Sequence, residues 1–298
     1  IMQERQTLVD ITTRALQGLH RVMEDIRPDV VLVHGDTSTT FAGGLAAFYS
    51  KIPVAHVEAG LRSGDIYSPF PEEMNRKLTG CMASLHFAPT ASNRKNLLEE
   101  GVPGERIFTT GNTVIDALRT TVSPDYAFQH PALQQVDFSR RVIAVTAHRR
   151  ENLGEPLANI CKALMAIVER HEDVEIVYPV HLNPAVQTTV RAELGGHPRV
   201  HLIDPLDLQD MHNLIARCYF VMTDSGGLQE EAPSLGKPVL VLRGETERPE
   251  ALAAGTVRMA GSDFERVFGL ADLLLGSPDA YSRMARAVNP YGDGRASD

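Results

Sequence analysis

The chain has 298 residues, a length that favours two domains over one. Apolar residues make up 43% and charged residues 22%, as in an ordinary globular protein. The formal net charge of −9 argues against a nucleic-acid or membrane-surface role, because both partners attract a basic face.

Three cysteines, Cys81, Cys161 and Cys218, have neither paired spacing nor a Cys/His metal pattern. We therefore expect buried free thiols in a reducing compartment and no metal. The sequence also contains no signal peptide and no apolar run long enough to span a bilayer. These features favour a cytoplasmic enzyme.

The first half of the chain predicts alternating helices and strands. Apolar residues recur at three- and four-residue steps from Leu8 to Ile26 and predict an amphipathic helix, which Pro28 ends. Thr90 is expected to cap a later helix that Gly101 closes. Strands are predicted at 29–36, 52–60, 84–90 and 106–112, a helix at 37–50, and a polar loop at 61–80.

The second half repeats the alternation after a connection at 114–140 that is rich in helix breakers. Helices are predicted at 156–170, 208–216 and 228–235, and a loop at 244–255. Strands are predicted at 141–148, 174–181, 200–204, 219–222 and 237–243. Strands that alternate with helices predict parallel sheets covered on both sides, which is an α/β fold.

Polar residues follow the predicted strands, where ligands bind in parallel α/β sheets. Asp36, Glu58, His148, His181 and the segment 224–227 all lie at such ends. Two domains of this kind facing each other would gather these residues in one cleft.

The segment 219–238 has the order strand, glycine turn, helix, which can present backbone N–H groups to a phosphate. Glycine lets the backbone approach the ligand without a Cβ in the way. Ser225, Gly226 and Gly227 form the turn, and Glu231 lies one helical turn further on, where it could reach ribose hydroxyls. The alternative is a helix capped by Ser225 with two loop glycines, because short glycine motifs are often accidental.

Three acids in the first half could perform acid–base chemistry if their surroundings separate their pKa values. They are Asp36, Glu58 and Glu72. The alternative is structural, with Asp36 and Glu72 each capping a helix.

Cationic groups could bind a diphosphate. His148 is followed by two arginines, and it could bind phosphate or carry a proton. Arg248 is a second candidate because a guanidinium binds phosphate through two parallel hydrogen bonds. The alternative for His148 is a ring that hydrogen-bonds a backbone carbonyl, and the alternative for Arg248 is a solvated loop arginine. The chain has no nucleophile elbow, Walker lysine motif or GxGxxG after a strand, which disfavours hydrolase, kinase and NAD-dependent functions.

Nine motifs occur along the chain in a characteristic order. They are HGDTSTT, HVEAGLRSGD, SPFPEEMNR, TGNTVIDAL, TAHRREN, YPVHLNP, TDSGGLQEEAPSLGKPVLVLR, TERPEA and NPYGDG. Taken together, these motifs resemble the non-hydrolysing UDP-N-acetylglucosamine 2-epimerases in order and content over essentially the whole chain. The resemblance implies a GT-B architecture of two Rossmann-like domains with an interdomain active-site cleft. It places domains at 1–118 and 119–285, and a tail at 286–298 that returns toward the N-terminal domain.

The same resemblance implies a reversible interconversion of UDP-GlcNAc and UDP-ManNAc for surface polysaccharides, through a glycal intermediate. It implies no cofactor and an allosterically controlled homodimer. Carried over motif by motif, the catalytic residues are Asp36, Glu58, Glu72 and His148. The expected UDP-binding residues are Ser225, Gly226, Gly227, Glu231 and Arg248, and the residues of a regulatory second UDP-GlcNAc site are Arg149 and His181.

The sequence departs from the family pattern in three places. Family members begin with a strand and a GTRPE-type loop, and they end with a closing helix. This sequence starts at IMQERQT and stops at Asp298, so we expect an internal fragment. Leu206 and Met211 stand where some relatives place glutamine and phenylalanine near the uracil, which puts the base stacking in doubt.

Three alternative functions stay open from the sequence. A hydrolysing relative shares most of these motifs and would release free ManNAc and UDP. A GT-B glycosyltransferase would need an acceptor groove. A non-catalytic nucleotide-sugar sensor would not need the three acids and His148.

Overall fold

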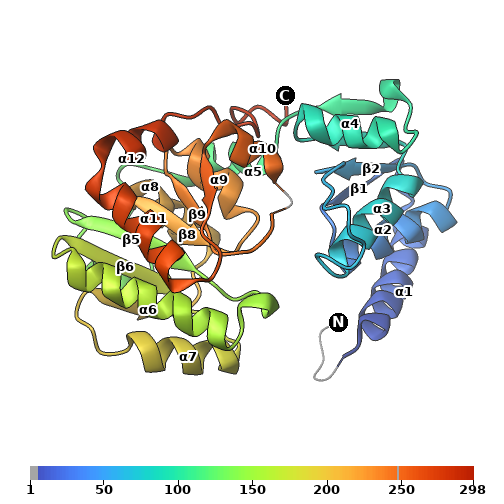
Figure 1. The fold of residues 1–298 in the computed structure, drawn as a ribbon. Helices are drawn as coiled ribbons and strands as arrows, with labels where there is room; N and C mark the ends of the chain where they lie inside the picture. The colour runs from blue at the N-terminus through green and yellow to red at the C-terminus, as the bar shows by residue number, and fades with distance from the viewer. Residues whose placement is uncertain (1–5, 247) are drawn as a thin grey trace. The chain divides into compact units, whose positions relative to one another are not determined.

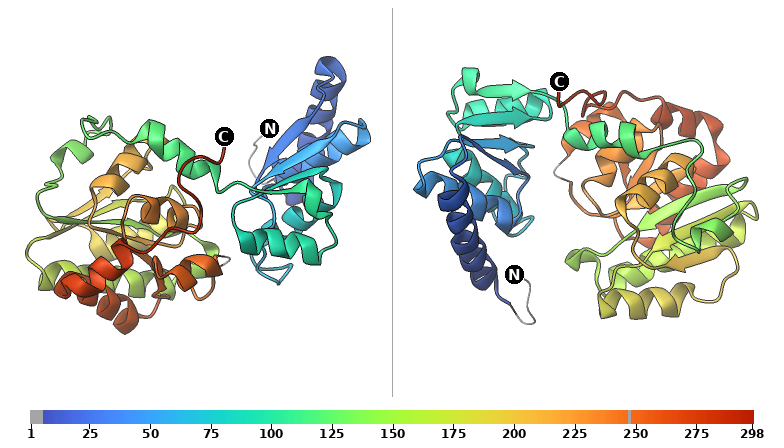
Figure 2. Two further views of the ribbon diagram at one scale, coloured as in Figure 1. Left: turned by 90° about the horizontal axis from the view of Figure 1, so that it is seen from above. Right: turned by 180° about the vertical axis from the view of Figure 1, so that it is seen from behind.

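The computed structural model describes residues 6–246 and 248–298, so residues 1–5 and Glu247 of the TERPEA motif lie outside it. The chain divides into two compact units (Figures 1 and 2). Unit 1 comprises the residues up to Thr113 together with Arg295–Asp298, and unit 2 comprises Val114–Gly294. Each contains a parallel sheet with helices packed against it, so the predicted α/β fold is confirmed.

Unit 1 has a four-stranded sheet in the order β1-β2-β3-β4. The strands are β1 (Val31–His34), β2 (Val54–Val57), β3 (Leu85–Ala88) and β4 (Ile107–Thr109). The helices are α1 (Leu8–Ile26), α2 (Ser38–Tyr49), α3 (Glu72–Met82) and α4 (Ala91–Glu99).

Threonine caps begin three of these helices. Thr7, Thr37 and Thr90 each accept a hydrogen bond from the backbone N–H three residues later, and Asp10 completes a capping box with Thr7. Such caps satisfy N–H groups that have no partner within the helix. The predicted cap at Thr90 is therefore confirmed.

The predicted loop at 61–80 is wrong in its second half, where α3 begins at Glu72. The buried face of α3 carries Glu73, Asn75, Arg76 and Thr79. Hydrophobic periodicity cannot detect a helix that buries polar side chains. The same side chains build part of the candidate site.

Unit 2 has a six-stranded parallel sheet in the order β10-β9-β8-β5-β6-β7. The strands are β5 (Arg141–Thr146), β6 (Val174–Pro179), β7 (Val200–Ile203), β8 (Phe220–Thr223), β9 (Val239–Val241) and β10 (Val257–Met259). The helices are α5 (Thr113–Thr121), α6 (Glu155–Arg170), α7 (Pro184–Leu194), α8 (Leu208–Arg217), α9 (Leu228–Ser234), α10 (Pro249–Ala254), α11 (Phe264–Gly276) and α12 (Pro278–Ala285).

The strand order reverses between β5 and β8. From β5 the chain adds β6 and β7 on one side, and it then returns to add β8, β9 and β10 on the other. Ligands of open α/β sheets bind at this kind of switch point, beyond the carboxyl ends of the two strands. The predicted loop at 244–255 contains α10, and the sequence patterns did not predict α7, β10, α11 or α12.

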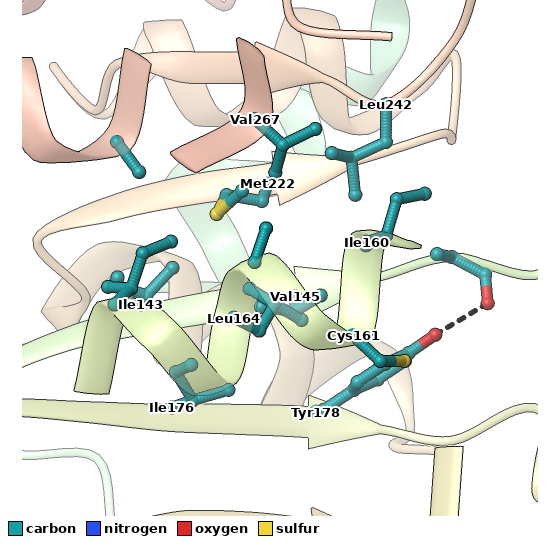
Figure 3. Packing of buried hydrophobic residues seen from close by; sticks show 14 of the residues in the cluster. Ile143, Val145, Ile160, Cys161, Leu164, Ile176, Tyr178, Met222, Leu242 and Val267 are labelled. Atoms are coloured by element: carbon teal, nitrogen blue, oxygen red, sulfur yellow. Dashed lines mark hydrogen bonds between the residues drawn. The ribbon is translucent and has the colours of Figure 1, made fainter. Parts of the chain in front are cut away.

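The sheet of unit 2 separates two hydrophobic layers. Along β5, Val142 and Ala144 pack in one cluster with residues of α5, α8 and α9. The alternate residues Ile143 and Val145 pack in the other cluster with α6, α7 and α11, as Figure 3 shows for Leu164 of α6. Side chains of a strand point to opposite faces in turn, so a continuous apolar run is what a doubly covered strand requires.

The cysteine prediction is correct for two residues and wrong for the third. Cys161 and Cys218 are free and buried, and burial raises the pKa of each thiol to about 12. Cys81 is free but exposed. Within the described part of the chain, none of the helices combines the length and apolar character that a bilayer crossing needs.

Leu164 gives a direct test of the core of unit 2. It is 0% exposed, so Leu164→Ala should lower the free energy of unfolding by about 2–5 kcal/mol through lost burial and a residual cavity. Leu182 is 70% exposed, and Leu182→Ala should change it by less than about 0.5 kcal/mol. Urea unfolding of both variants measures the difference, and equal effects would contradict the assignment of the core.

Candidate active site

Two of the predicted acids in unit 1 share one arginine. Asp36 and Glu58 follow β1 and β2, whose parallel register aligns His34 with Val57. Arg76 of α3 is buried, and its Nη2 lies 2.6 Å from Asp36 Oδ2 and 3.9 Å from Glu58 Oε1. Its Nη1 also donates to the Glu58 carbonyl. A buried guanidinium therefore compensates for two carboxylates at the carboxyl end of the sheet.

The backbone at these strand ends is unusual. Glu58 has φ 63°, in the left-handed region that non-glycine residues rarely adopt. Gly35 has φ 73°, and a Cβ there would lie 3.1 Å from Glu58 Oε2. The glycine thus leaves room for the carboxylate, which lies 3.4 Å from His34 Nε2.

Two histidines of this site have opposite pKa shifts. A hydrogen bond to Glu58 raises the pKa of His34. Burial lowers the pKa of His56 to about 3, although its Nε2 donates to the Gly35 carbonyl at 2.8 Å. His56 Nδ1 has no hydrogen-bond partner among the described residues, so the ring stays neutral and holds the turn at Gly35.

The two capping roles considered for acids of unit 1 are wrong. The N-cap of α2 is Thr37, not Asp36, and the N-cap of α3 is Pro71, not Glu72. Glu72 is the half-buried first residue of α3. Its neighbour Glu73 is buried and accepts N–H groups of the preceding loop, so Glu73 is a structural acid.

In unit 2, the glycine turn after β8 lies against a buried arginine. Arg248 is 6% exposed, and its Nε donates to Glu230 Oε1 at 2.6 Å. A Cβ on Gly226 would lie 2.4 Å from Arg248 Nη1, and one on Gly227 would lie 3.0 Å from Glu231 Oε1. Both glycines therefore make room for charged side chains. The alternative cap at Ser225 is wrong, because Gly227 is the N-cap of α9 and no side chain caps it.

A buried carboxylate joins the ends of β8 and β5. Asp224 Oδ2 accepts the backbone N–H groups of His148 and Arg149, at 2.7 and 2.8 Å, and the Asn152 side chain at 2.9 Å. Asp224 Oδ1 lies 3.6 Å from His148 Nδ1. Asp224 therefore orders the loop that carries His148. The sequence placed Asp224 at a strand end but did not identify this role.

The predicted histidines of unit 2 stack on each other. The rings of His148 and His181 are 5.0 Å apart with an interplanar angle of 9°. Burial lowers the pKa of His148, Asp224 raises it, and His181 and Arg149 lower it further. The net shift is downward, so His148 is neutral near pH 7 and able to accept a proton.

These side chains open onto a pocket of about 380 Å³ at the switch point of unit 2. The pocket brings together five predicted residues: His148, His181, Met211, Ser225 and Glu231. Gly226, Gly227, Arg149 and Arg248 are not among its lining residues, and Asp36, Glu58 and Glu72 belong to unit 1.

The lining also includes His212 of α8, which the sequence analysis did not single out. Its position among apolar residues of the predicted helix at 208–216 is the feature of the sequence that could have identified it. Within residues 6–246 and 248–298, no group of three or more His, Cys, Asp or Glu side chains is arranged to hold a metal ion.

Comparison with known proteins assigns the family. The family model described as UDP-N-acetylglucosamine 2-epimerase matches residues 1–298. The chain belongs to the UDP-N-acetylglucosamine 2-epimerase family. It is 59% identical over 297 residues to the UDP-N-acetylglucosamine 2-epimerase of Bacillus subtilis, covering 100% of this chain and 77% of the relative.

Solved structures of the epimerase family agree with the fold. The UDP-GlcNAc 2-epimerase from Neisseria meningitidis bound to UDP-GlcNAc is 46% identical, with a TM-score of 0.94 over 100% of this chain and 81% of that one. The S. aureus MnaA–UDP co-structure is 49% identical, with a TM-score of 0.94 over 99% and 80%. The chain thus shares the GT-B type α/β fold of these epimerases.

We expect Asp224→Asn to damage the pocket of this epimerase-family chain. An amide cannot accept three N–H donors on one atom without turning its own N–H₂ toward His148, which leaves buried groups unsatisfied. The backbone amides of His148 and Arg149, which Asp224 accepts, should exchange with D₂O at least about tenfold faster in hydrogen-exchange measurements. Asp204 is exposed just after β7, and Asp204→Asn is the control. Equal exchange rates in both variants would refute the ordering role.

The lowered pKa of His56 predicts that the stability of unit 1 depends on pH. Its folded pKa of about 3 lies below the ordinary histidine value of 6.5, so the unfolded chain binds one more proton between these values. This contribution lowers stability as pH falls through that window, by up to about 1.4 kcal/mol per pH unit. His56→Gln keeps an amide donor but cannot titrate, so its stability should fall less between pH 6.5 and 5.

Hydrogen exchange of the β1 and β2 amides measures this effect for unit 1 alone. The difference between wild type and His56→Gln at pH 8, where the histidine is neutral in both states, serves as the control for packing. A difference that stays constant from pH 8 to pH 5 would contradict the assignment.

Proposed function

We propose that the chain interconverts UDP-GlcNAc and UDP-ManNAc by inversion at C2, through elimination and re-addition of UDP. The observation that carries the proposal is the pocket at the switch point of unit 2, which His148, Ser225 and Glu231 line. Membership of the epimerase family and the resemblance to a relative crystallised with UDP-GlcNAc support the same substrate.

In this proposal unit 2 holds the uridine diphosphate. The first N–H groups of a helix have no acceptor within that helix, and the turn at Gly226 and Gly227 leads directly into α9. The guanidinium of Arg248 packs on Gly226 and adds positive charge beside the turn. Glu231 would accept ribose hydroxyls, and Met211 with Leu206 would provide an apolar wall for the uracil.

The chemistry explains why carboxylates are needed. The C2 proton of the sugar is not acidic, because the ring has no adjacent carbonyl. A base removes this proton while the C1–O bond breaks, its electron pair leaves with UDP, and a C1–C2 double bond forms. UDP then adds back to C1 while an acid delivers a proton to the opposite face of C2. No oxidant or reductant enters the balance.

Asp36, Glu58 and Glu72 are the proposed proton-transfer groups, without individual assignment. Asp36 and Glu58 share Arg76, which keeps two carboxylates available at one strand end. His148 is the proposed fourth catalytic group, and its lowered pKa suits a neutral proton acceptor. We further propose that Arg149 and His181 serve the regulatory site, because His181 stacks directly on His148.

Incubation with UDP-GlcNAc in D₂O tests the reaction. The elimination route should yield UDP-ManNAc with deuterium at C2, and ¹⁸O placed in the C1–O bridge should scramble into the diphosphate. Asp36→Asn should slow deuterium incorporation by about 10²–10⁴-fold. Asp29→Asn, an exposed acid just before the opposite end of β1, is the control and should keep the wild-type rate.

Other products would favour the other functions. Free ManNAc with UDP, and no UDP-ManNAc, would indicate the hydrolysing reaction. Sugar transfer to an acceptor without epimerisation would indicate a glycosyltransferase. Bound but unchanged UDP-GlcNAc without deuterium would indicate a sensor.

A further inference from the structure

A fully buried histidine lies behind the proposed ribose-binding acid. His212 of α8 is 0% exposed, yet it lines the pocket together with Glu231. Its Nε2 lies 3.4 Å from Glu231 Oε2, and its Nδ1 lies 2.7 Å from Thr121 Oγ1. The Nε2 contact falls short of a hydrogen bond, and this atom has no hydrogen-bond partner among the described residues. A buried polar atom in this condition is costly unless a ligand completes its surroundings.

The Glu231 carboxylate favours one position for the ring proton, and the Thr121 hydroxyl is compatible with it. An ionised carboxylate has only acceptors, so the ring nitrogen opposite Glu231 is stabilised as Nε2–H. The Thr121 hydroxyl suits this state. It can donate to a bare Nδ1, or it can turn to the Ala117 carbonyl at 2.8 Å and accept from a protonated Nδ1. Nε2–H is therefore supported in the neutral and in the cationic ring.

The Glu231 carboxylate lies between the His212 ring and the space that Gly227 leaves open. Its Oε2 faces the His212 ring, and its Oε1 lies 3.0 Å from the point where a Cβ on Gly227 would be. The side chain is 12% exposed, so little of it meets solvent beyond the pocket. The His212 ring is therefore the neighbour that faces Oε2 inside the fold.

We propose that His212 is a positioning residue that orients Glu231 to bind the vicinal diol of a ribonucleotide. This inference rests on the proposed function, because it takes Glu231 as the ribose acid. When the ribonucleotide binds, the carboxylate accepts hydrogen bonds from both hydroxyls and moves closer to Nε2–H. The His212 Nε2 atom thereby gains a hydrogen-bond partner. His212 thereby sets the preference for ribose over 2′-deoxyribose and contacts no reacting atom.

The test compares binding of UDP and 2′-deoxy-UDP to the 298-residue chain by calorimetry. We define the discrimination as the ratio of the Kd for 2′-deoxy-UDP to the Kd for UDP. In wild type it should be about tenfold or more, because a hydrogen bond to a charged group is lost. Glu231→Ala, which removes every hydrogen-bonding atom of this side chain, should bring it close to one.

Two substitutions of His212 separate positioning from packing. In H212N the amide reaches Thr121 but not Glu231, and the discrimination should fall toward one. In H212Q the longer amide can still donate to Glu231, and most of the discrimination should return. A merely structural role would weaken binding of both ligands equally and leave the ratio unchanged in H212N, which would overturn the inference.

A measurement on the wild-type chain covers the case in which H212N does not fold. Long-range ¹H–¹⁵N spectra of the histidine rings, assigned by comparison with H212Q, report the proton position. A proton on Nε2 supports the inference, and a ring protonated only on Nδ1 overturns it. Wild type that binds UDP without discrimination also overturns it, whereas wild type that binds no UDP overturns the proposed function itself.

Discussion

The buried carboxylate of Asp224 is the interaction on which the pocket of unit 2 depends. β5 and β8 are neighbours in the sheet although their aligned positions, such as Thr146 and Thr223, lie 77 residues apart in the chain. Strand pairing by itself does not fix the loops beyond the strand ends. Asp224 Oδ2 collects three N–H donors from the loop after β5. A charge-assisted acceptor inside the fold is strong because water does not compete for it. Asp224 thereby fixes the conformation of the loop that lines the pocket at the switch point.

Glycines make the remaining charged side chains possible. In unit 1, Gly35 leaves space beside the Glu58 carboxylate. In unit 2, Gly226 leaves space for the Arg248 guanidinium and Gly227 for the Glu231 carboxylate. Their absent Cβ atoms leave room for charged side chains of the protein itself. The glycine turn after β8 therefore has a structural reason in addition to the phosphate binding that the sequence predicts.

Several buried charges in these sites have a compensating partner. Arg76 serves Asp36 and Glu58, while Glu230 holds Arg248. Burying an isolated charge costs several kcal/mol, so a site that needs charged groups must pair them or leave them in water. His148, which stacks on His181, follows the same constraint, since burial is the main reason that its pKa is lowered.

The sequence by itself determined the α/β class and the polar residues at the strand ends, because apolar runs and helix caps act within a few residues of chain. It also placed Asp36, Glu58, His148 and the turn at 225–227 at carboxyl ends, where parallel sheets bind ligands. It assigned the start of α3 to a loop, because the buried face of that helix carries polar side chains.

Only the tertiary structure decided which distant residues serve these sites. Arg76 reaches Asp36 across 40 residues of chain, and His212 meets Thr121 across 91. Such pairs depend on the order of the strands and on which helix covers which face. Local sequence patterns contain no information on either, so the partners of Asp36 and Glu231 can be identified only from the tertiary structure.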